Sequence, residues 1–144
     1  VVGNPDDVNR AVEHLGHVSE RTLTDEEVGA AFDAVMTAYK LPKATEAEKK
    51  SRRKAIEQAT HTATEVPLEV AQAATTVLDH LRRLVSIGSP SMASDVKTGE
   101  HLAVAALRGA LENVKINLDS IQDQDFRERV RNQATQLEAV SAGK

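Results

Sequence analysis

The segment that decides the fold is GEHLAVAALRGALENVKINLDSI, residues 99–121. Large apolar residues recur in it at steps of three and four, the spacing of one face of an α-helix. These residues are Val104, Leu107, Leu111, Val114 and Leu118. A second stripe at the same spacing carries only small or amide side chains, namely Gly99, Ala103, Ala106, Ala110, Asn113 and Asn117. Because the distance between packed helices depends on the side chains between them, this helix is expected to lie close to its neighbours.

The two asparagines at the end of the second stripe predict polar contacts on an otherwise apolar surface. A buried amide without hydrogen-bond partners costs about 1 to 3 kcal/mol. Asn113 and Asn117 are therefore expected to bond either to the backbone of a neighbouring helix or to a ligand. The sequence leaves both possibilities open.

The rest of the chain is also expected to be helical, because it lacks the alternation of apolar and polar residues that is typical of strands. Capping residues mark helix starts at Asn4, Thr24 and Thr45. Pro67 is expected to kink or restart a helix, since proline removes one backbone hydrogen bond and clashes with the preceding turn. We predict an all-α protein, an up-and-down bundle of about five to six helices that forms a single domain over residues 1–144.

Composition restricts the class of protein. The absence of cysteine excludes disulfides and thiolate metal sites. A net charge of −4 argues against a protein whose main role is to neutralise phosphates. The longest uninterrupted apolar run, residues 102–107, is far shorter than the roughly 20 residues that span a bilayer. The sequence therefore predicts a cytoplasmic protein that binds neither nucleic acid nor membrane.

A histidine pair and a basic run could indicate a metal site or a nucleic-acid site, but we interpret both as residues on solvated helix faces. His14 and His17 are close enough on a helix to share a metal ion, but no third ligand can be named, so no metal is expected. Basic residues crowd positions 49–54, yet acids share this helix and no aromatic side chain interleaves to stack on bases.

Two parts of the chain resemble a known family. Residues 41–68, LPKATEAEKKSRRKAIEQATHTATEVPL, and 88–118, GSPSMASDVKTGEHLAVAALRGALENVKINL, are similar to formiminotetrahydrofolate cyclodeaminases and methenyltetrahydrofolate cyclohydrolases. The specific elements are Leu41-Pro42-Lys43, Val66-Pro67-Leu68, Ser94-Asp95 and the signature from Asn113 to Leu118. The resemblance implies an all-helical enzyme that forms a homodimer or larger oligomer and acts on a one-carbon unit carried by tetrahydrofolate.

The sequence also departs from the family pattern. The family usually opens with a Pro-Gly-Gly-Gly segment and a helix after it, and neither is found ahead of residues 1–10. Val28 stands where the family tends to have an acid, and residues 96–99 are less apolar than usual. The resemblance therefore implies the fold together with a substrate pocket that this sequence contains only in part.

The implied reaction points to a catalytic carboxylate. In the cyclodeaminase reaction the folate N10 closes on the formimino carbon, ammonia leaves, and the methenyl product is a cation delocalised over two nitrogens. A preorganised carboxylate would stabilise that cation. Asp95 is the expected catalytic residue, with capping of the helix that it begins as an equally suitable role. The proton donor is not identified.

The substrate-binding candidates are Ser94, Asn113, Asn117 and Lys43. The asparagines would bond the amide-like edge of the pterin, with helix-to-helix bonds as the alternative. Lys43 would meet the glutamate tail of folate, with no specific role as the alternative. Three hypotheses follow: a folate one-carbon enzyme with either activity, a non-catalytic helical module for self-association or folate binding, and a nucleic-acid binder that uses the basic helix.

Overall fold

The structure, a computed structural model, describes residues 25–88 and 90–141. Its elements are the α-helices α2 (Asp25–Tyr39), α3 (Glu46–Ile87), α4 (Ala93–Leu118) and α5 (Gln124–Ser141), with the short 3₁₀ helix η1 (Pro90–Met92) before α4. No strand occurs in these ranges, so the all-α prediction is confirmed.

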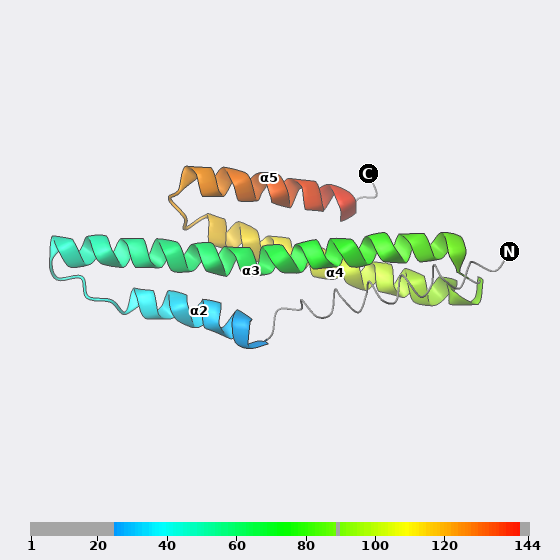
Figure 1. The fold of residues 1–144 in the computed structure, drawn as a ribbon, viewed down its shortest axis with the longest axis horizontal. Coiled ribbons are helices and arrows are strands. Elements are labelled where there is room, and N and C mark those ends of the chain that lie inside the picture. Colours follow the sequence, from blue (N-terminus) through cyan, green and yellow to red (C-terminus); the bar gives the residue numbers. More distant parts are fainter. Residues whose placement is uncertain (1–24, 89, 142–144) are drawn as a thin grey trace.

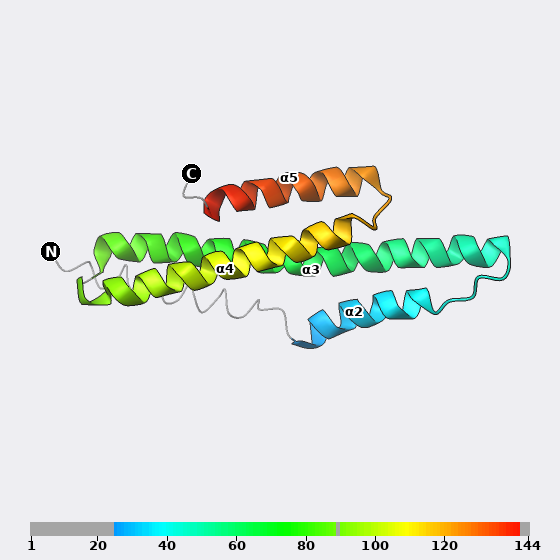
Figure 2. The same ribbon diagram turned by 180° about the vertical axis from the view of Figure 1, so that it is seen from behind.

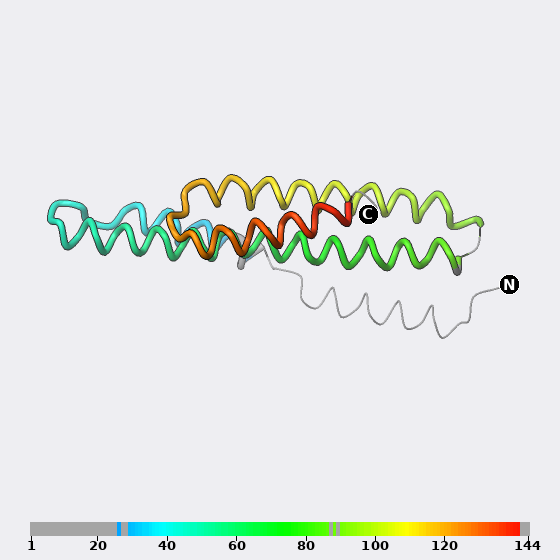
Figure 3. Tube along the Cα trace, turned by 90° about the horizontal axis from the view of Figure 1, so that it is seen from above, coloured from blue at the N-terminus to red at the C-terminus, as the bar shows by residue number. Residues whose placement is uncertain are grey.

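Helix α3 is the axis of the molecule. It has 42 residues, which corresponds to about 63 Å at 1.5 Å per residue. Figures 1 and 2 show α2 and α5 on opposite sides of α3, with α2 beside its N-terminal half. In Figure 3, α4 runs antiparallel beside the C-terminal half of α3. The central layer is therefore the α3–α4 pair.

The predicted number of about five to six helices is wrong for the described residues, which form four α-helices. The expected kink or restart at Pro67 is not a break, since α3 runs through this residue. Proline lacks the N–H that would bond the Ala63 carbonyl one turn earlier. The Asn117 side chain donates to that carbonyl instead, at 2.9 Å, which explains how the helix continues. The helix expected after Asn4 lies outside the described residues.

The core confirms the large apolar stripe of α4. Leu107, Leu111, Val114 and Leu118 are buried, and Val104 is partly buried. The stripe contacts both α3 and α5, and its partners form two clusters. The first cluster is Ala71, Ala74, Leu78, Ala103, Leu107, Ala110, Leu111 and Ala134, and the second is Leu68, Val114, Leu118, Ile121, Phe126 and Val130.

Helix α2 is held less firmly than α4. Its buried residues are Ala31 and Ala38 among those of α2 whose burial is described. It packs on α3, and Arg52 of α3 donates two hydrogen bonds to the Tyr39 carbonyl at the end of α2, at 3.1 and 3.3 Å. Two alanines remove little apolar surface from water. Among its residues whose burial is described, α2 therefore buries little apolar surface.

The start of α3 confirms the capping box predicted at Thr45. The Thr45 hydroxyl accepts the Glu48 backbone N–H at 3.2 Å. The Glu48 carboxylate accepts the N–H groups of Thr45 and Ala44 at 2.9 and 2.8 Å. These backbone bonds lower the pKa of Glu48 from its ordinary value of 4.5.

Within residues 25–88 and 90–141, no helix combines the length and the hydropathy that crossing a bilayer requires.

Candidate functional site

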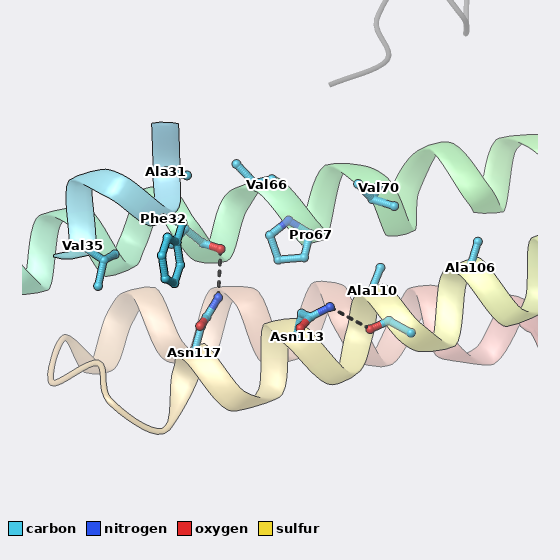
Figure 4. A pocket seen from close by; sticks show the side chains of 12 residues that line it. Ala31, Phe32, Val35, Val66, Pro67, Val70, Ala106, Ala110, Asn113 and Asn117 are labelled. Atoms are coloured by element: carbon cyan, nitrogen blue, oxygen red, sulfur yellow. Dashed lines mark hydrogen bonds between the residues drawn. The ribbon is translucent and has the colours of Figure 1, made fainter. Parts of the chain in front are cut away.

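A groove of about 540 Å³ lies between α2, α3 and α4 (Figure 4). Its walls are apolar except for two amide side chains on α4. The lining residues are Ala31, Phe32 and Val35 from α2, Ala63, Val66, Pro67 and Val70 from α3, and Ala106, Gly109, Ala110, Asn113 and Asn117 from α4. Concave, mostly apolar sites with a few placed polar groups are typical of small-molecule binding sites.

The small-residue stripe of α4 packs closely against α3 in one part and lines the groove in another. Gly99 allows close packing, because a Cβ atom there would lie 3.1 Å from the Leu81 side chain of α3. Ala103 and Ala110 are buried as well. Gly109, which precedes Ala110 and is not part of the stripe, has open space where a Cβ atom would stand. The stripe therefore brings the helices together toward the start of α4 and leaves room for the groove farther along.

Asn117 joins α4 to α3 at the edge of the groove. Its Nδ2 donates to the Ala63 carbonyl at 2.9 Å, drawn as a dashed line in Figure 4. This is the helix-to-helix bond that the sequence left open for Asn117. The bond links two family-like motifs, since Ala63 lies one turn before Pro67 and Asn117 belongs to the signature at residues 113–118.

Asn113 bonds within its own helix. Its Nδ2 donates to the Gly109 carbonyl at 3.3 Å, and its side chain is exposed in the groove. In the part of the chain that the structure describes, neither Asn113 nor Asn117 uses its Oδ1 in a hydrogen bond. Both predicted binding residues therefore reach one site, and each has an unused acceptor there.

Phe32 supplies an aromatic wall that the sequence did not identify. Phe32 is 64% exposed and lines the groove. Among the residues of α2 whose burial is described, the buried ones are the neighbouring Ala31 and the more distant Ala38. Phe32 could have been singled out because aromatic residues are rare in this sequence, which contains only three.

Asp95 and Ser94 lie away from the groove, in the first turn of α4. Asp95 is eighteen residues before Asn113 on this helix, or about 27 Å at 1.5 Å per residue. Both residues are exposed, and the Asp95 carboxylate makes no hydrogen bond to any described residue. Helix α4 begins at Ala93, and its N-cap residue is Met92 with no side-chain capping bond, so the capping role expected for Asp95 is not seen. One copy of the chain therefore does not bring Asp95 to the asparagines.

Lys43 lies at the opposite end of the molecule. It is exposed in the loop that connects α2 to α3, before the capping box. The first groove residue of α3, Ala63, comes about five turns after the start of that helix. The four predicted substrate-binding residues thus occupy three separate places.

In residues 25–88 and 90–141 no three histidine, aspartate or glutamate side chains are placed to hold a metal ion together. His14 and His17 lie outside the described residues.

Several known proteins are similar to this chain in sequence and fold. The formiminotransferase-cyclodeaminase family model matches residues 5–136. The methenyltetrahydrofolate cyclohydrolase of Methylorubrum extorquens is 40% identical over 98 residues, which cover 68% of this chain and 47% of that protein. The formimidoyltransferase-cyclodeaminase of Gallus gallus is 36% identical over 107 residues, which cover 74% of this chain and 20% of that protein.

A solved structure agrees with these sequence matches. The crystal structure of formiminotetrahydrofolate cyclodeaminase from Thermotoga maritima superposes with a TM-score of 0.71 at 25% identity. The match covers 96% of this chain and 62% of that chain. This chain thus spans about half of the Methylorubrum protein and a fifth of the Gallus protein. The resemblance seen in the sequence is confirmed, and the chain belongs to the formiminotransferase-cyclodeaminase family.

Proposed function

We propose that this chain acts in tetrahydrofolate one-carbon chemistry, as a formiminotetrahydrofolate cyclodeaminase or a methenyltetrahydrofolate cyclohydrolase. The observation that carries the proposal is the groove between α2, α3 and α4, which lies within the family match. Its apolar walls and exposed Phe32 suit a flat heterocycle, and Asn113 and Asn117 suit its polar edge. The names of the relatives include both reactions.

Both reactions involve the same methenyl cation. The cyclodeaminase forms it when N10 bonds to the formimino carbon and the bond to departing ammonia breaks. The cyclohydrolase consumes it when water adds to the methenyl carbon, a proton is released and the bond from that carbon to N5 breaks, which leaves a formyl group on N10. In the cyclodeaminase direction, a fixed negative charge near that carbon favours the cation and the transition state that leads to it. No carboxylate lines the groove among the described residues, so the charge has to come from elsewhere.

A second copy of the chain can supply this charge. Leu102 is 67% exposed on α4, and Ala106 and Gly109 follow it on the same exposed side at steps of four and three. In an antiparallel pair of α4 helices related by a two-fold axis near Leu102, residues equally far from Leu102 lie opposite each other. The partner's Asp95 then lies beside Gly109. We therefore propose a homodimer in which Asp95 of one copy serves the groove of the other.

The alternative is a non-catalytic module of the same fold. It is favoured by one observation, the separation of about 27 Å between Asp95 and Asn113 along α4 within one chain. Such a module would use the groove to bind folate, or the exposed side of α4 to self-associate, without turnover.

Absorbance of the methenyl product distinguishes these functions. The purified chain is supplied with formiminotetrahydrofolate in one reaction and with methenyltetrahydrofolate in another, each beside a protein-free control. A protein-dependent gain of methenyl absorbance in the first reaction identifies a cyclodeaminase, and a faster loss in the second identifies a cyclohydrolase. Tight folate binding with neither change supports the module, and neither binding nor turnover contradicts both functions.

A further inference from the structure

The amide groups of the groove are already oriented by the backbone. Asn117 donates through Nδ2 to the Ala63 carbonyl at 2.9 Å, and Asn113 donates through Nδ2 to the Gly109 carbonyl at 3.3 Å. An asparagine amide has two N–H donors on nitrogen and two acceptor sites on oxygen. One N–H of each amide is engaged, whereas both acceptor sites of each oxygen are unused by the described residues, so each oxygen is open to a ligand donor.

Pro67 fixes the orientation of Asn117. The Ala63 carbonyl receives no backbone N–H one turn later, because residue 67 is proline. A flipped Asn117 amide would bring its own oxygen against the Ala63 oxygen and leave both without a donor. In every arrangement that keeps the Ala63 carbonyl hydrogen-bonded to Asn117, the Asn117 nitrogen is therefore the donor and its oxygen remains the acceptor for a ligand.

The two oxygens belong to consecutive turns of α4. Residues four apart on a helix have Cβ atoms about 5–6 Å apart, which lets one small molecule reach both side chains. The other lining residues offer no polar side chain, so the polar groups of the groove are the two unused amide oxygens and the remaining N–H of each amide. Phe32, 64% exposed on the α2 wall, offers a ring face for stacking.

We infer that the groove holds the pterin ring by its amino end, with the two hydrogens of the 2-amino group donating to Asn113 Oδ1 and Asn117 Oδ1. An amino group carries two hydrogens that point in different directions, so one edge can serve two acceptors on successive turns. The 4-oxo group needs a donor and faces away from the asparagines. This inference rests on the proposed function and adds the direction in which the substrate lies.

The orientation has a chemical consequence for the one-carbon unit. The amino edge of a pterin is across the bicyclic ring from N5, the nitrogen that carries or receives the one-carbon group. With the amino edge at Asn113 and Asn117, N5 lies toward Gly109 and Ala106, farther along the groove. These two residues present little side chain, which leaves room for the reacting carbon.

The first test compares two small probes that carry no one-carbon unit. Pterin has the 2-amino group, and lumazine has an oxygen in its place. Binding of each to the whole chain is measured by titration calorimetry or ligand fluorescence. We expect pterin to bind at least about 10-fold more tightly than lumazine, because sites built around a ligand N–H reject analogues that lack it. Equal affinities, tighter binding of lumazine, or no binding of either probe at millimolar concentration overturns the inference.

The second test separates the acceptor from the donor of Asn113. Asn113→Asp keeps the oxygen and removes the N–H, so pterin affinity should be kept or increased. Asn113→Leu removes the acceptor at similar size, so pterin affinity should fall about 10-fold while lumazine affinity changes little. Asn132→Asp, at an exposed position of α5, is the matched control. Loss of pterin binding in Asn113→Asp but not in this control overturns the inference.

The two proposals fail in different ways. Turnover of a folate substrate with no discrimination between pterin and lumazine keeps the proposed function and rejects the orientation. Discrimination with no turnover keeps the orientation and rejects catalysis by this chain. Asn113 is exposed, so both variants are expected to fold, and circular dichroism spectra verify this.

Discussion

The side-chain amide of Asn117 donates a hydrogen bond to the carbonyl oxygen of Ala63, the acceptor that Pro67 leaves without its helical partner. The two residues are 54 positions apart in the chain. One bond therefore lets α3 continue as a single helix and sets the position of α4 along it. A proline that would otherwise weaken α3 becomes a point of attachment between the two longest helices.

This relationship predicts that Pro67 and Asn117 are energetically coupled. Asn117→Leu leaves the Ala63 carbonyl unpaired and should lower the free energy of unfolding by about 1 to 3 kcal/mol. In a Pro67→Ala background residue 67 regains its N–H, so the same substitution should cost much less. Urea unfolding of the four proteins in this double-mutant cycle measures the coupling energy. Additive effects of the two substitutions would mean that the bond contributes nothing beyond the helix itself.

A second prediction concerns Glu57, which holds the turn between α4 and α5. Its Oε1 accepts the backbone N–H groups of Gln122 and Asp123 at 2.7 and 2.8 Å. Glu57→Ala should destabilise the chain by about 1 to 3 kcal/mol, because two charge-assisted bonds are lost. Hydrogen exchange should show faster opening of α5 than of α3.

Glu46 provides the comparison for Glu57. Its carboxylate pairs with Lys49 at 2.7 Å on the exposed first turn of α3. Such surface pairs contribute about 0 to 1 kcal/mol, so Glu46→Ala should change stability little. If the two alanine variants lose equal stability, the turn is not held by Glu57.

A third prediction is a dependence of the start of α3 on pH. The backbone N–H groups of Thr45 and Ala44 hold the pKa of Glu48 below its ordinary value of 4.5. A depressed pKa means that the carboxylate stabilises the fold above its unfolded pKa, and that this contribution is lost as the pH falls through the folded pKa. The amide resonances of Ala44 and Thr45 should therefore titrate with a midpoint below 4.5. In Glu48→Gln this transition should vanish, and a midpoint above 4.5 would contradict the assignment.

The fourth prediction separates chemistry from stability at Asp95. Its carboxylate makes no hydrogen bond to any residue that the structure describes, so Asp95→Asn should leave the melting temperature almost unchanged. Loss of one preorganised electrostatic group typically lowers turnover about 100-fold to 1,000-fold. Initial rates and thermal melts on the same preparations test this prediction. Asp33→Asn, at an exposed position of α2, is the control. Full activity in Asp95→Asn would place the catalytic charge at another residue.

The fifth prediction tests the shared site directly. If Asp95 serves the groove of the partner, a heterodimer of Asp95→Asn and Asn113→Leu chains contains one intact site and one doubly altered site. Mixing equal amounts of the two impaired variants should then restore about a quarter of the activity, because half of the dimers are mixed and half of their sites are intact. Light scattering should report dimers throughout. A monomer at high micromolar concentration, or no recovery on mixing, rejects the shared site.

Periodicity was enough to predict the helices and the buried stripe of α4, because Leu107, Leu111 and Val114 repeat at a spacing that only a helix places on one face. The continuity of α3 was not predictable in the same way. It depends on Asn117, which is distant in sequence and reaches Ala63 only after α4 has folded back. Local rules predict that proline removes one backbone hydrogen bond from a helix. Whether another donor bonds the unpaired carbonyl depends on tertiary contacts, here on Asn117.

The site was predictable only in part for the same reason. Asn113 and Asn117 stood out as amides on an apolar stripe, and the structure places both in the groove. Phe32 was not identified, because its wall exists only once α2 lies beside α3 and opposite α4. The position of Asp95 relative to the groove depends on how copies associate, which no pattern within one chain encodes.

The slight burial of α2 affects how often the groove is complete. This helix contributes a wall of the groove, yet Ala31 and Ala38 are its only buried residues among those whose burial is described. Segments with few buried apolar contacts open at a lower free energy than the rest of a protein. A ligand that contacts Phe32 binds the docked form of α2, so its apparent affinity scales with the fraction of molecules in which α2 is docked. Substitutions that strengthen this docking should therefore raise affinity without touching the ligand.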